Sequence, residues 1–161
     1  MWAVIVSLTS TTPDATELGF VLHKHPDRVR TVEVSAGRAH VFFPEATPQR
    51  CTATVVVEVD PIALARRGRG QRPAPGLEPY VNDRPYAASS MLSVALGKLF
   101  ATALRGSCEQ RPELVERPLA LEVDLPVVPV RGGETVLRRL FEPLGWAVTA
   151  APIGLDERFP A

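Results

Sequence analysis

The sequence has few of the residues on which several common kinds of site depend. It contains two cysteines, Cys51 and Cys108, which lie far apart and have no ligand-like neighbours, so a disulfide scaffold and a cysteine zinc site are poorly supported. Lysine occurs only twice, against sixteen arginines. Eighteen basic and eighteen acidic side chains cancel, so no net charge attracts nucleic acid or a membrane surface.

Long apolar runs and catalytic motifs are also missing. Residues 2–9 form a short apolar run without a charged flank, which is unlike a signal peptide or a membrane span, and we expect a cytoplasmic protein. No Walker loop, Rossmann glycine motif, Glu-x-x-His spacing or His-x-x-x-His spacing occurs. The sequence therefore predicts no catalytic residue, no bound metal and no bound cofactor in this chain.

What is present is typical of a soluble globular domain. Of the 161 residues, 45% are hydrophobic and 22% are charged, which disfavours disorder. Hairpins and about three main helices predict an α+β fold with a mixed sheet. Residues 66–79 are rich in Gly, Pro and Arg, and they leave open a division of the domain 1–161 into two lobes at that point. The ending LDERFPA favours a fragment of a larger protein.

Apolar periodicity and turn residues place the expected elements. Helices are predicted at residues 15–23, 89–104 and 134–144, the first with a capping box formed by Asp14 and Glu17. Strands are predicted at residues 2–9, 29–34, 38–43, 51–60, 119–130 and 146–150. Residues 29–34 and 38–43 should form a hairpin. Residues 51–60 should be central in the sheet, and the prolines of 119–130 favour an edge.

Three short stretches keep more than one interpretation. HKHPDR (residues 23–28) is typical of charge complementarity at a helix end, with a partner contact or a metal as alternatives. Gly132 and Gly133 favour a flexible helix entry over an anion site. Residues 66–79 favour a solvated loop, but four arginines there could also bind RNA phosphates: Arg66, Arg67, Arg69 and Arg72.

The densest polar and aromatic cluster is YVNDRPYAASS (residues 80–90). It is most typical of a turn followed by a helix cap. A partner-binding surface is the main alternative, because Tyr and Arg are frequent interface anchors, and catalysis is the least supported one. Phe42 and Phe43 are adjacent in a predicted strand, so they face opposite ways and one of them can be a surface anchor. The candidate partner-binding residues are Tyr80, Asn82, Asp83, Arg84, Tyr86, Phe42 and Phe43.

Several stretches together resemble the N-terminal domain of the bacterial RNA 3′-terminal ribose 2′-O-methyltransferase of the RNA-repair system. They are LGFVLHKHPDR (18–28), AHVFFPEAT (39–47), YVNDRPYAASS (80–90), RRLFEPLG (138–145) and LDERFP near the end. The resemblance covers nearly the whole chain except the loop at residues 66–79.

The resemblance implies a ligase-associating domain. In that family a separate C-terminal domain carries the methyltransferase, with S-adenosylmethionine and a divalent metal, and this chain ends before it. What remains implies a non-catalytic module that binds and activates the ligase part of a polynucleotide kinase–phosphatase–ligase in a hetero-oligomer. Broken RNA, such as cut tRNA, would be reached through the complex. The alternative is an RNA-binding domain that positions broken ends with its Arg-rich loop, and an independent enzyme is the least supported class.

Overall fold

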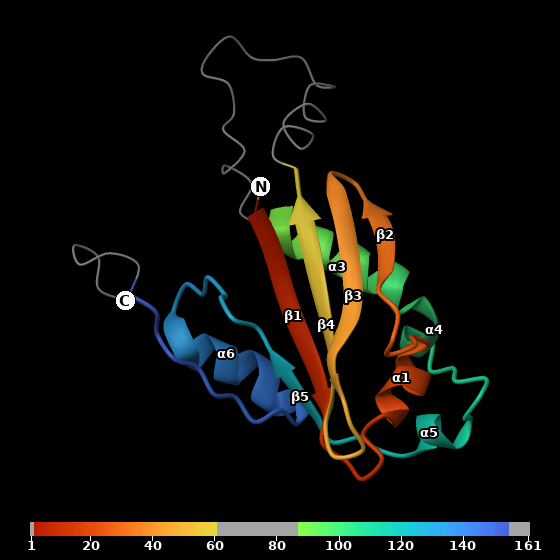
Figure 1. Ribbon diagram of the computed structural model, residues 1–161. Coiled ribbons are helices and arrows are strands. Elements are labelled where there is room, and N and C mark those ends of the chain that lie inside the picture. Colours follow the sequence, from red (N-terminus) through yellow and green to blue (C-terminus); the bar gives the residue numbers. More distant parts are fainter. Residues whose placement is uncertain (1, 61–86, 155–161) are drawn as a thin grey trace. The chain divides into compact units, whose positions relative to one another are not determined.

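The computed structural model describes residues 2–60 and 87–154. Its five-stranded antiparallel sheet has the order β2-β3-β4-β1-β5 (Figure 1). The strands are β1 (Trp2–Ser10), β2 (Arg30–Val34), β3 (Gly37–Ala46), β4 (Cys51–Val59) and β5 (Leu121–Asp124). The predicted α+β class, the hairpin of β2 and β3, the central β4 and the edge position of β5 are confirmed. The predicted mixed sheet is wrong, because every strand pair in the described residues is antiparallel, and the strand predicted at residues 119–130 is confined to β5, before the prolines.

The described helices are short, apart from one that lies across the sheet. They are α1 (Glu17–Leu22), α3 (Ala87–Leu99), α4 (Ala101–Leu104), α5 (Glu113–Glu116), α6 (Gly133–Phe141) and the 3₁₀ helix η3 (Glu142–Leu144). Figure 1 shows α3 behind the sheet, crossing β4 and β3. None of the helices in the described part of the chain is long and apolar enough to span a membrane.

The single helix predicted at residues 89–104 is interrupted at Phe100. This residue leaves the helical region (φ −118°, ψ 24°) and separates α3 from α4. Its partly buried ring packs against both clusters of the hydrophobic core. The break therefore places one aromatic side chain where the two clusters meet, which helical periodicity alone does not reveal.

The core has two clusters on one face of the sheet. In the first, Met91, Ala95 and Leu99 of α3 cover the central strands β3 and β4. In the second, Leu18 and Leu22 of α1 cover the opposite end of the same face. The buried apolar residues of β2, β3 and β4 follow the alternation of a strand, and they are Val34, Ala39, Val41, Cys51, Ala53, Val55, Val57 and Val59.

The start of α1 corrects one local prediction. Asp14 has a left-handed backbone (φ 62°), and the helix has no side-chain cap. The backbone N–H of Glu17 donates to the carbonyl of Asp14 over 2.8 Å. The Glu17 side chain instead binds two arginines distant in sequence, Arg111 and Arg117, so the capping box is absent.

The chain separates into two compact units, Met1–Pro126 and Val127–Ala161. The division predicted near residues 66–79 falls outside the described residues. In the second unit α6 and η3 confirm the predicted helix, and Gly145 ends it with φ 87°. The strand predicted at residues 146–150 is wrong: these residues form no ladder, and the Trp146 N–H donates to the Phe141 carbonyl over 3.3 Å. Alternation of apolar and polar residues alone does not make a strand, because a strand also needs a neighbouring strand to pair with.

Candidate functional site

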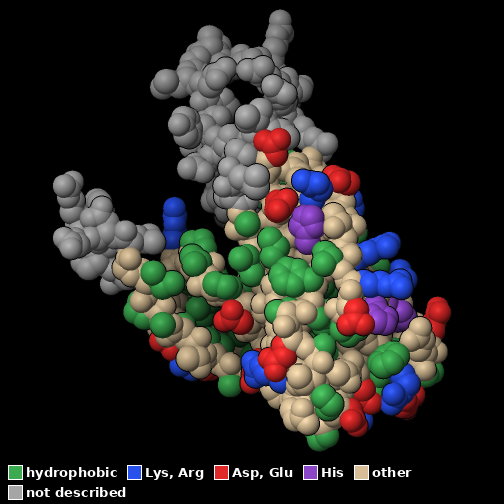
Figure 2. Space-filling view, in the orientation of Figure 1, with side chains coloured by type: hydrophobic (Ala, Val, Ile, Leu, Met, Phe, Trp, Pro, Cys, Tyr) green, Lys and Arg blue, Asp and Glu red, His purple; other side chains and the backbone are tan. Residues whose placement is uncertain are grey.

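The face of the sheet turned away from α3 is the main candidate, and we call it the open face. It is formed by alternate residues of three adjacent strands, and the antiparallel register sets them in cross-strand rows. One row contains His40, Val56 and Ile5, and the next contains Phe42, Thr54 and Ser7. In Figure 2, which views this side, hydrophobic side chains gather over the middle of the strands.

The centre of the open face is apolar and only partly covered. Ile5 is 42% exposed, and Val56 and Phe42 are half-buried. Hydroxyl groups extend the surface toward the other end of the strands, where Ser7 and Thr54 share a hydrogen bond of 3.0 Å. An apolar centre with polar groups around it is the usual arrangement of a protein interface.

Charged side chains surround this centre on two sides. At the β2 side, His40 Nδ1 lies 2.9 Å from the Thr31 hydroxyl, and its shielded Nε2 lies 3.5 Å from the Glu58 carboxylate without a hydrogen bond. At the other end, Arg50 donates to Glu122 over 3.2 Å. The Arg50–Glu122 pair is about half exposed to solvent, so it contributes more to the choice of partner than to stability.

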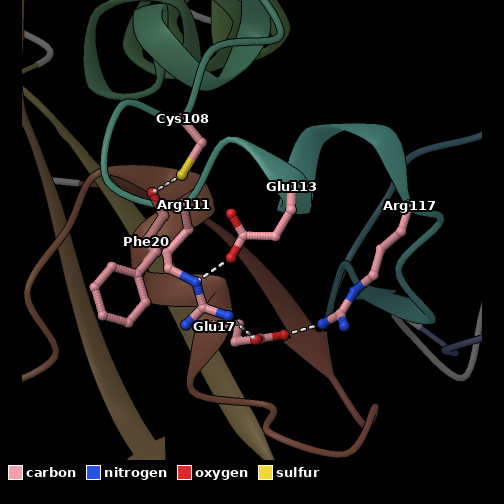
Figure 3. Close-up of polar contacts among 6 residues, drawn as sticks. All are labelled: Glu17, Phe20, Cys108, Arg111, Glu113 and Arg117. Atoms are coloured by element: carbon pink, nitrogen blue, oxygen red, sulfur yellow. Dashed lines mark hydrogen bonds and ion pairs between the residues drawn. The ribbon is translucent and has the colours of Figure 1, made fainter.

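A second polar cluster joins α1 to the segment that ends in α5 (Figure 3). Glu17, only 7% exposed, binds Arg111 at 2.9 Å and also pairs with Arg117. Arg111 pairs in addition with Glu113, and hydrogen bonding to Arg111 is the main cause that lowers the Glu113 pKa. The Cys108 thiol donates to the Phe20 carbonyl over 3.5 Å. Every group in the cluster has a partner, so it acts as a structural tie.

The HKHPDR stretch forms the end of α1 and the turn after it. His23 takes a left-handed conformation (φ 54°), and Lys24 Nζ donates to the carbonyls of Leu22 and His23. This agrees with a charge at the helix end. Within residues 2–60 and 87–154 no group of three or more metal-ligating side chains forms.

The structure separates the two adjacent phenylalanines. Phe42 lies on the open face opposite Thr54, whereas Phe43 packs against the core cluster under α1. An irregularity in the β3–β4 register follows between Phe42 and Glu45. The other candidates fall outside the described residues: Tyr80, Asn82, Asp83, Arg84 and Tyr86 for the partner, and Arg66, Arg67, Arg69 and Arg72 for RNA. Those assignments stay predictions.

Sequence reasoning missed Ile5 and Val56 as surface residues. Both lie in runs of apolar residues that indicate strands buried on both faces. The available signal was the hydroxyl residues two positions away, Ser7 and Thr54, since they share a face with Ile5 and Val56 and mark it as partly solvated.

These features define an α+β domain whose first unit presents an apolar sheet face between charged groups. Residues 4–161 match a protein-family model described as the RNA repair, ligase-Pnkp-associating region of Hen1. The chain therefore belongs to this family, as its sequence resemblance predicted. No curated protein matches the chain.

Proposed function

We propose that this chain is a non-catalytic module that binds the ligase part of Pnkp and activates it for sealing broken RNA. Its family is the ligase-Pnkp-associating region of Hen1, which supports the partner. Activation requires that the chain contact a sealing-competent ligase conformation more favourably than other conformations. RNA then reaches the complex through the ligase, and the working unit is a hetero-oligomer.

The observation that carries this proposal is the open face. Helices cover one face of the sheet, whereas the other presents Phe42, Val56 and Ile5 between charged groups. Aromatic residues are enriched at the centres of interfaces, and Phe42 is the aromatic residue on the three central strands of this face. We assign the open face as the surface that contacts the ligase.

The test replaces Phe42 by alanine in the full chain. We expect the Kd for the ligase to rise at least tenfold, because truncating a central anchor removes apolar contact and exposes its neighbours to water. Calorimetric titration measures the Kd. At low chain concentration the stimulation of nicked-RNA sealing should fall with binding, and it should recover when the variant saturates the ligase.

Val29→Ala is the matched control. Val29 is 65% exposed and precedes β2 outside the cross-strand rows of the open face, so the control removes exposed apolar surface elsewhere. It should bind and stimulate like the wild type. A Phe42→Ala chain that folds and binds with unchanged affinity would overturn the assigned surface. A wild-type chain that binds the ligase without raising sealing would overturn activation.

A further inference from the structure

The second unit carries an apolar stripe that its own structure does not bury. The stripe consists of Leu137, Leu140, Phe141 and Leu144, at the spacing i, i+3, i+4, i+7 of one helix face. Leu140 is 59% exposed, Phe141 41% and Leu144 72%. No residue among 127–154 is buried. In the first unit, by contrast, α1 and α3 bury apolar residues in the core clusters.

One flank of α6, next to the stripe, carries its own ion pairs. Arg138 binds Glu134 at 2.6 Å and Glu142 at 2.9 Å, each four residues away. Hydrogen bonds to these two carboxylates, chiefly Glu142, raise the Arg138 pKa. Charges that satisfy one another in this way offer little to a partner. The apolar stripe is left unburied within residues 127–154, so its burial against a partner would favour binding.

Helix length adds a second argument. α6 has nine residues, and a helix of that length is marginal in water without tertiary contacts. Exposed ion pairs four residues apart stabilise a helix only slightly. A surface packed against the stripe would supply the remaining stabilisation of α6, because burial of an apolar face stabilises most helices in proteins.

We propose that this stripe docks into an apolar groove on the ligase partner, as a second contact separate from the open face. The proposal rests on the proposed function. The occupant is inferred from the family match, because residues 4–161 include the whole stripe and the region is described as ligase-Pnkp-associating. An amphipathic helix that presents residues at i, i+3, i+4 and i+7 fits the helix-in-groove mode of recognition. The groove should be lined by aliphatic and aromatic side chains, since the stripe carries no charge.

The experiment compares two charge-matched variants of the full chain, Leu140→Glu and Thr135→Glu. Both add one negative charge to α6, but Thr135 is an exposed residue beside the ion-paired side of the helix. Titration against the ligase should show a Kd at least tenfold higher for Leu140→Glu, because the groove would have to bury a carboxylate. Thr135→Glu should bind like the wild type. Unchanged affinity of a folded Leu140→Glu chain overturns the proposal.

Two further measurements separate the possible failures. If Leu140→Glu unfolds the chain, Leu144→Gln, at the most exposed stripe position, replaces it with the same expected direction. Sedimentation of each chain alone tests self-association: a mass that falls on Leu140→Glu with an unchanged ligase Kd assigns the stripe to a second copy and overturns the proposal. If the wild type does not bind the ligase, the proposed function fails. If Phe42→Ala weakens binding and Leu140→Glu does not, only the stripe proposal fails.

Discussion

The two units of this chain use similar apolar residues for opposite purposes. In Met1–Pro126 the aliphatic side chains of β3, β4, α1 and α3 enter two core clusters, and several are completely buried. In the described part of Val127–Ala161, valine, leucine, phenylalanine and tryptophan stay at the surface. Hydrophobic content alone therefore does not show whether a segment builds a core or presents apolar side chains at the surface. The burial of each residue shows which of the two it does.

The largest expected difference between the units is in their response to truncation. Leu18→Ala should lower the free energy of unfolding by about 3 kcal/mol, because Leu18 is 1% exposed in the cluster under α1 and its removal leaves a cavity. Leu140→Ala should leave this free energy unchanged, since the side chain is already in water. Urea denaturation measures both. Equal losses for the two variants would abolish the distinction between the units.

Removing a carboxylate should also lower stability more in the first unit than in the second, but by a smaller difference. Glu17→Gln leaves Arg111 and Arg117 without their shared buried anion and should lower the free energy of unfolding by about 2 kcal/mol. The loss stays below that of a fully buried pair, because both arginines are partly exposed. Glu134→Gln, in the exposed ladder of α6, should have no measurable effect. Thermal unfolding measures both variants. If Glu17→Gln were as stable as the wild type, the ion pairs of Glu17 would have no structural role.

The smallest effect concerns pH and belongs to the first unit. Burial, and then the nearby Arg30, lowers the Lys24 pKa below 10.5. Between the folded pKa and 10.5 the unfolded chain holds more protons, so this group makes stability rise with pH in that window. Below the folded pKa both states are charged and the slope vanishes. Lys24→Met should remove this alkaline rise relative to the wild type in melting curves that extend across this window to pH 11. An identical slope in both chains would show that Lys24 is fully solvated.

Much of the fold could be predicted from local patterns, and the failures have physical causes. Residues 51–60 are dense in β-branched side chains, and this run alone indicated the central strand β4. The break at Phe100 depends on a contact with two clusters that lie apart in sequence. The strand predicted after Gly145 failed because alternation specifies one strand but cannot supply the neighbour that it needs to pair with.

The candidate site was less predictable than the fold. Alternation showed that Phe42 and Phe43 face opposite ways, but only the register of β3 on β4 shows that Phe42 is on the open face. Ile5 and Val56 meet there because β1 and β4 pair antiparallel with these residues opposite each other. Such a juxtaposition depends on strands about fifty residues apart in sequence, which local periodicity does not address.

The short ladder between β5 and β1 has a mechanical consequence. β5 pairs through four residues only, from Leu121 opposite Ser10 to Asp124 opposite Ser7, and the second unit begins three residues after β5 ends. Any tension that a bound partner exerts through Val127 reaches the sheet along this strand, whose Glu122 is also attached to Arg50. The four β5–β1 residue pairs would therefore take up a force applied at Val127 before the longer ladder of β1 and β4 does.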